Sequence, residues 1–174
     1  HQSTQAEIDL YLKEVTVQIT KGALKPEEIA VTLWTSASRL NDMELCSHIN
    51  AAVRDDAPPL IDKVVPMCRL LNSLVVRGRH RDAKSVWADG HKTYRGLGMP
   101  FKHFEFFAIG KIYRAPMYLA SSFDRDIALS FMRMNAGSGN LPVLITINIH
   151  PELGCAHANY LEAYSAVKNE KEIL

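Results

Sequence analysis

Asn169-Glu170-Lys171-Glu172-Ile173-Leu174, the last six residues of the sequence, are typical of the opening of a β-strand. Side chains two apart on a strand point to the same face, so Glu170 and Glu172 are expected to stand side by side. Neighbouring carboxylates repel each other, and proteins keep such a pair mainly where a cation or a reaction requires it. Taken alone, Glu-Lys-Glu is more often a solvated surface pattern, so its meaning depends on the segments that precede it.

The length and composition of the chain predict one globular domain, or a domain with a helical extension. It has 174 residues, of which 47% are hydrophobic and 22% charged, and its formal net charge is +1. This balance gives no electrostatic argument for a nucleic-acid or membrane partner. No apolar run approaches the length of a bilayer span.

Cysteine usage bears on the compartment and on metal binding. Cys46, Cys68 and Cys155 are widely separated, which favours a reducing, cytoplasmic setting without fixing the localisation. No CxxC or HxxxH pair occurs, so we expect no metal site.

The first half of the chain has the 3.6-residue periodicity of helices. We expect an N-terminal helical lobe over residues 1–85, with helices at 6–20, from Pro26 onward, at 43–54 after a cap at Asn41-Asp42, and at 60–76 with a bend at Pro66.

The second half has shorter apolar runs and predicts a mixed, mainly antiparallel β core over residues 86–174. The expected strands are His91–Gly96, with Gly98–Pro100 turning away, Ala115–Ala120, residues 142–149, and a further strand near 157–162. Between them we expect one or two helical turns from Phe101, a helix after Asp124, and loops at Asn135–Asn140 and Tyr164–Asn169.

Three motifs stand in order along this second half. They are Tyr94-Arg95-Gly96, then the segment Tyr118–Phe131 with Ser121-Ser122 and the helical Ala128-x-x-Phe131, then Glu170-Lys171-Glu172. This series resembles the Y-R-G, F-x-S-T-S and E-x-E motifs of the arginine-specific mono-ADP-ribosyltransferases, the R-S-E class that uses NAD. The helical segment with Asn50, Arg54 and Asn72 is also similar to helices that lead into such domains.

The resemblance implies an α+β fold in which the helical lobe precedes a β-sandwich-like NAD-binding core of the ADP-ribosyltransferase type. Two features depart from the family pattern. Ala120 stands where the first Ser of S-T-S is usual, so Ser121 or Ser122 supplies that hydroxyl or the contact is absent. The core also ends two residues after Glu172, where the family continues the strand, so we expect a core truncated at its C-terminus.

The resemblance also implies the activity: one ADP-ribose moves from NAD to an arginine of a target protein, and nicotinamide leaves. In this scheme Glu172 holds the ribose and stabilises an oxocarbenium-like state, and Glu170 orients the acceptor guanidinium and takes its proton. Arg95 pairs with the dinucleotide phosphates, Gly96 allows close backbone approach, and Ser121 or Ser122 contacts the ribose.

Other interpretations remain open at this stage. Water can replace the acceptor, which gives NAD hydrolysis without a need for Glu170, and an inactive NAD-fold interaction module is a third possibility. Tyr164 is a candidate contact for the acceptor protein, with a packing role as the equal alternative. Without the motif series, Arg95 would be a strand-end ion pair, and Ser121 and Ser122 would be helix caps.

Overall fold

The computed structural model describes residues 17, 25–37, 39–40, 42–56, 58–75, 91–112, 114–150 and 158–174. The chain forms two compact units: His1–Arg79 with Ala163–Lys168, and His80–Glu162 with Asn169–Leu174. The boundary expected at residue 85 lies outside the described residues, as does the helix expected at 6–20 apart from Val17.

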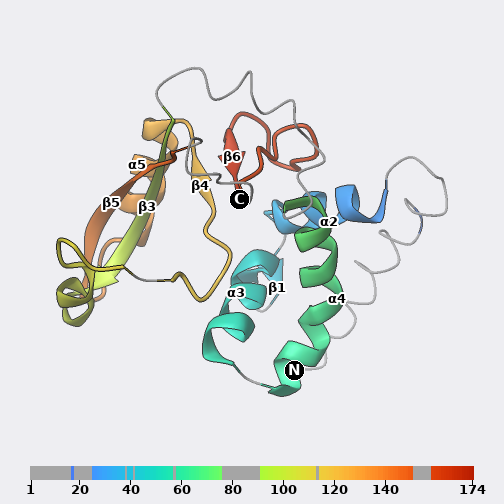
Figure 1. Cartoon of the computed structure of the whole chain (residues 1–174), viewed down its shortest axis with the longest axis horizontal. Helices are drawn as coiled ribbons and strands as arrows, with labels where there is room; N and C mark the ends of the chain where they lie inside the picture. Colours follow the sequence, from blue (N-terminus) through green and yellow to red (C-terminus); the bar gives the residue numbers. More distant parts are fainter. Residues whose placement is uncertain are drawn as a thin grey trace. The chain divides into compact units, whose positions relative to one another are not determined.

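The described residues of the first unit are mainly helical, as the periodicity predicted. It contains α2 (Pro26–Trp34), α3 (Leu45–Asp55) and α4 (Pro58–Val75) (Figure 1). Pro26 begins α2, and the Glu28 carboxylate accepts a hydrogen bond from the Lys25 N–H at 2.8 Å, which satisfies one of the free amides of the first turn. Trp34, Ile49 and Leu71 supply the largest fully buried side chains of this unit's core.

One local prediction for the first unit is wrong, and one helix has a different start. The cap expected at Asn41-Asp42 is replaced by a small antiparallel pair, β1 (Arg39–Leu40) and β2 (Met43–Glu44), and Glu44 stands at the N-cap of α3. Asp42 has a φ of 62°, a conformation that Asp tolerates in tight turns. The helix expected at 60–76 begins earlier, at Pro58, and Pro66 lies inside it without ending it.

The second unit contains a four-stranded antiparallel sheet in the order β5-β3-β4-β6 (Figure 1). The strands are β3 (Lys92–Pro100), β4 (Ser121–Ser122), β5 (Asn140–Asn148) and β6 (Glu172–Ile173). The described part of the chain is therefore of the α+β class, as predicted. Within the described residues of this unit a single sheet is seen.

β3 is longer than predicted. The sequence suggested a strand that ends at Gly96 and turns away at Gly98, but β3 pairs with β5 without a break from Lys92–Asn148 to Pro100–Asn140. Both glycines are explained by helix α5 (Arg125–Asn135), which lies against β3. A Cβ at Gly96 would stand 1.7 Å from the Ala128 carbonyl oxygen, and one at Gly98 would stand 1.8 Å from the Asn135 carbonyl oxygen. The glycines therefore allow a helix backbone to approach the strand, and they make no turn.

The remaining connections agree in part with the sequence. The short helical turns are present as η2 (Phe101–Phe107), the helix after Asp124 is α5, and the strand expected at 142–149 is β5. The prediction of a strand at Ala115–Ala120 is wrong, because in this region only Ser121 and Ser122 pair with other strands of the sheet. Near 157–162, the described residues form an isolated bridge between Tyr160 and Ile173.

We predict that Gly96→Ala destabilises the protein by about 3 kcal/mol, since the new methyl group meets the main chain of α5, which cannot move as a side chain can. Urea unfolding measures the change. Ser130→Thr is the control, because it adds one methyl group at an exposed position of the same helix and should change stability by no more than about 0.5 kcal/mol. Equal stability of the two variants would contradict the close approach of α5.

Candidate active site

Neighbouring strands of the second unit bring the three motifs together. β4 lies between β3 and β6, with Tyr94 opposite Ser122 and Ser122 opposite Glu172. Directly opposite residues on antiparallel strands share a face, with Cα atoms about 4.5–5.5 Å apart. Residues that are far apart in the sequence, Ser122 and Glu172, are therefore cross-strand neighbours.

Arg95 lies on β3, the strand next to β4, but its side chain is not on the sheet face that Ser122 and Glu172 share. It follows Tyr94 by one residue, so the pleat of β3 turns its side chain toward the opposite face. The Arg95 side chain is half-buried, and its Nη1 donates a hydrogen bond to the Ala120 carbonyl oxygen at 2.5 Å. Its guanidinium thus contacts the residue that immediately precedes β4.

The two serine hydroxyls have different partners, and both serines are buried. Ser121 Oγ donates to Thr93 Oγ1 at 3.0 Å and so links β4 to β3. Ser122 Oγ donates to the Glu170 carbonyl oxygen at 2.5 Å and accepts from the Asp124 N–H at 2.9 Å. The N-cap of α5 is Asp124, whose carboxylate accepts from the Asp126 N–H, so the interpretation of the serines as helix caps is wrong.

Glu170 and Glu172 are not two residues of one regular strand. β6 begins at Glu172, while Asn169 and Lys171 have φ values of 69° and 48°, in the left-handed region. The alternation of side chains therefore does not extend back to Glu170, and the expectation that both acids share one strand face is wrong. Both side chains are half-buried.

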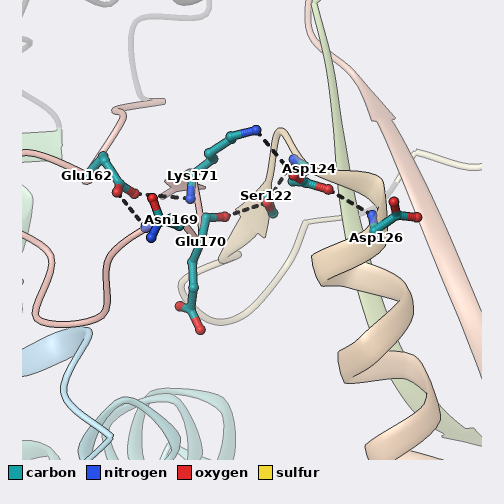
Figure 2. Close-up of polar contacts among 7 residues, drawn as sticks. All are labelled: Ser122, Asp124, Asp126, Glu162, Asn169, Glu170 and Lys171. Carbon is teal, nitrogen blue, oxygen red and sulfur yellow. Dashed lines mark hydrogen bonds and ion pairs between the residues drawn. The ribbon is translucent and has the colours of Figure 1, made fainter.

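The turn before β6 is tied to its surroundings by four other contacts, and Figure 2 shows those made by Glu162 and by the Lys171 side chain. The Phe123 N–H donates to the Lys171 carbonyl oxygen at 3.1 Å, and Lys171 Nζ lies 3.2 Å from Asp124 Oδ2. Glu162 accepts from two main-chain N–H groups of the turn, those of Asn169 and Lys171. The sequence reasoning did not identify Glu162 or the pairing of Asp124, because a single surface acid gives no signal of what it contacts.

The contacts of Asp124 change its titration. The hydrogen bond from Lys171, followed by that from the Asp126 amide, holds the pKa of this carboxyl below its usual value of 3.8. The lowered pKa means that the charged form is the one that stabilises the folded protein.

Gly96 and Tyr164 were also predicted as site residues. The close approach at Gly96 is that of α5, which accounts for the glycine without a ligand. Tyr164 belongs to the first unit, where its carbonyl oxygen accepts from Thr32 Oγ1 at 2.9 Å. Its side chain is half-buried rather than exposed. Burial, followed by the hydrogen bond and negative charge of Glu28, raises the pKa of Tyr164. These contacts favour a packing role.

Comparisons with known proteins add nothing to this geometry, since no protein-family model, curated protein or solved structure matches the chain. Among the residues that the structure describes, no three or more His, Cys, Asp or Glu side chains are grouped to hold a metal ion. None of the helices in the described ranges is long and apolar enough to cross a membrane.

We predict that Asp124→Asn lowers stability at pH 7 by about 0.5 kcal/mol, because Asn keeps the N-cap acceptor but loses the charge that pairs with Lys171. Since the folded-state pKa of Asp124 lies below 3.8, the difference in unfolding free energy between wild type and variant should have its full size above that pH. It should disappear as the pH falls through the folded-state value.

Urea unfolding at a series of pH values measures this difference. Asp126→Asn is the control, because it removes a charge from the same helix turn and leaves the Lys171 pair intact. A difference that grows toward low pH would contradict the assignment.

Proposed function

We propose that this protein transfers a single ADP-ribose from NAD to an arginine side chain of a target protein. The observation that carries the proposal is the register that sets Ser122 directly opposite Glu172, with the strand of Ser122 lying between the strand of Glu172 and the one that bears Arg95. The order of the motifs along the chain supports the same assignment. In this proposal the four-stranded sheet is the NAD-binding part of an ADP-ribosyltransferase-type core.

The chemistry makes two separate demands on the protein. Nicotinamide leaves as a neutral group, so the difficulty lies in the positive charge that develops on the ribose. In the proposal the Glu172 carboxylate stabilises that charge and holds the ribose 2′-hydroxyl. Ser122 fixes the neighbouring main chain through its bond to the Glu170 carbonyl.

The acceptor makes the second demand. A guanidinium stays protonated at physiological pH and is a poor nucleophile, so a base must take its proton as the new C–N bond forms and the bond to nicotinamide breaks. Glu170 precedes the strand and lies in a turn, which suits a group that faces the incoming acceptor. Target proteins and NAD are the partners in this scheme.

Arg95 is proposed to bind the dinucleotide phosphates. Its guanidinium contacts the Ala120 carbonyl oxygen, a neutral acceptor, and a phosphate would be the stronger partner because it is charged and accepts two hydrogen bonds. Ala120 offers no hydroxyl, so the ribose contact of this segment is assigned to Ser122.

NAD hydrolysis is the alternative function. It is favoured by the different ways in which the two acids are held. Glu172 is part of the sheet ladder, whereas Glu170 depends on a turn outside it. If the turn does not present Glu170 to an arginine, water can attack the ribose in its place.

Incubation with NAD labelled in the adenosine part, with and without agmatine as a small guanidine acceptor, tests the proposal. Label on agmatine is the expected result. Release of free ADP-ribose alone would make hydrolysis the activity. Binding of NAD without cleavage would make the chain an interaction module and overturn the proposal.

We predict that Glu170→Gln abolishes labelling of agmatine but keeps part of the NAD hydrolysis, because hydrolysis does not require a base for the guanidinium. Counting both products in one assay measures the ratio. Glu105→Gln, an exposed acid of η2, is the matched control and should leave both rates unchanged. Equal loss of both reactions in Glu170→Gln would contradict the role assigned to Glu170.

We predict that Arg95→Lys raises KM for NAD about tenfold, because an ammonium cannot form the paired hydrogen bonds that a guanidinium forms with phosphates. Steady-state kinetics with varied NAD measure the change, and kcat should fall less than KM rises. Arg133→Lys, at an exposed position of α5, is the control. An unchanged KM would remove Arg95 from the NAD site.

A further inference from the structure

Glu162 binds the turn that carries Glu170 through both of its carboxylate oxygens (Figure 2). Oε1 accepts from the Asn169 N–H at 2.7 Å, and Oε2 accepts from the Lys171 N–H at 3.1 Å. Hydrogen bonds to an ionised acceptor are about twice as strong as those between neutral groups. One side chain thus holds the residue before Glu170 and the residue after it.

These two neighbours need such support. Asn169 and Lys171 have φ values of 69° and 48°, and a residue with a side chain adopts this conformation at a cost of about 1–2 kcal/mol. Asn tolerates it better than Lys does, because the short amide can bond locally. The charge-assisted bonds to Glu162 offset this cost and fix the direction in which Glu170 leaves the main chain.

Glu162 is itself well anchored. The preceding residue, Leu161, is fully buried, and its N–H donates to the Glu172 carbonyl oxygen at 2.8 Å. The main chain next to Glu162 is therefore fixed by pairing with β6. The Glu162 carboxylate contacts the turn from the side opposite to Ser122 (Figure 2).

The two acids of the motif depend on Glu162 to different degrees. Glu172 is held by pairing with Ser122 on one side and by the Leu161 N–H on the other. Glu170 lies outside the strand, and its main chain is held by the Ser122 hydroxyl and by the two bonds of its neighbours to Glu162. Loss of Glu162 should therefore disturb Glu170 more than Glu172.

We infer that Glu162 is a positioning residue that sets Glu170 for the acceptor arginine and thereby determines the ratio of transfer to hydrolysis. The inference rests on the proposed function. Glu162 acts through the turn, so it contributes to selection of the acceptor rather than to cleavage of NAD. Both carboxylate oxygens are needed, because a glutamine would face one of the two N–H donors with its own NH₂ group.

Glu162→Gln tests the inference, with Glu105→Gln as the matched control. Transfer to agmatine should fall at least about tenfold in Glu162→Gln, as expected when a reacting group is misplaced, while NAD hydrolysis changes less than about threefold. A general loss of folding would instead lower both activities together. Amide hydrogen exchange of Asn169 and Lys171 should be faster in Glu162→Gln, and that of Leu174 unchanged.

The outcomes separate the inference from the proposed function. If the wild-type chain cleaves no NAD, the proposed function fails and the inference fails with it. If the wild type transfers ADP-ribose but Glu162→Gln keeps the wild-type ratio of products, the inference alone is overturned. Unchanged amide exchange at Asn169 and Lys171 would also overturn it.

Discussion

Main-chain pairing on both sides of β6 is the constraint on which the candidate site depends. On one side Glu172 and Ile173 pair with Ser122 and Ser121. On the other side Leu174 exchanges two hydrogen bonds with Asn159, at 2.8 and 2.9 Å. A two-residue strand has too little pairing of its own to be stable, so its place follows from this double ladder and from burial of Ile173, which is 2% exposed. The location of Glu172 is fixed in the same way.

The position of β4 depends in turn on α5. This helix follows β4 after two residues, begins at the Asp124 cap, and lies on the glycine-bearing face of β3. Because Gly96 and Gly98 let the helix backbone come so close, the segment that leads into the helix is held beside β3. The hydrogen bond between the Ser121 and Thr93 hydroxyls adds a side-chain link between β4 and β3. The packing of α5 on β3 therefore also brings the motif residues of β3 and β4 together.

The sequence predicted what periodicity and helix-start signals determine. Pro26 followed by Glu27 and Glu28 indicated α2, Asp124 before an amphipathic run indicated α5, and the apolar run at 142–149 indicated β5. The failures have a common cause. Gly98-Met99-Pro100 looks like a turn in sequence, and only the helix packed on β3 shows why glycine is required there. Likewise, Ser121-Ser122 becomes a strand through its partners in β3 and β6, which no local pattern contains.

The same argument applies to the site. The resemblance implied that Arg95, Ser122 and Glu172 serve one site. It did not predict the strand register, which places the Arg95 side chain on the opposite face of the sheet from Ser122 and Glu172. Glu162 could not be anticipated, because its partners are main-chain amides and any residue type supplies those.

The turn at Glu170 also bears on the separate roles that we propose for the two acids. Had Glu170 and Glu172 stood on one strand face, their like charges would have repelled each other at close range. Asn169 and Lys171 have left-handed backbone conformations, so the side-chain direction of Glu170 is not set by the pleat of the sheet. The Glu170 carboxylate therefore need not point to the same place as the Glu172 carboxylate. In the proposed reaction, the acid that stabilises the sugar cation must stay ionised, and the base that takes a proton from the guanidinium must face the acceptor. A turn that separates the two groups while keeping them two residues apart meets both requirements.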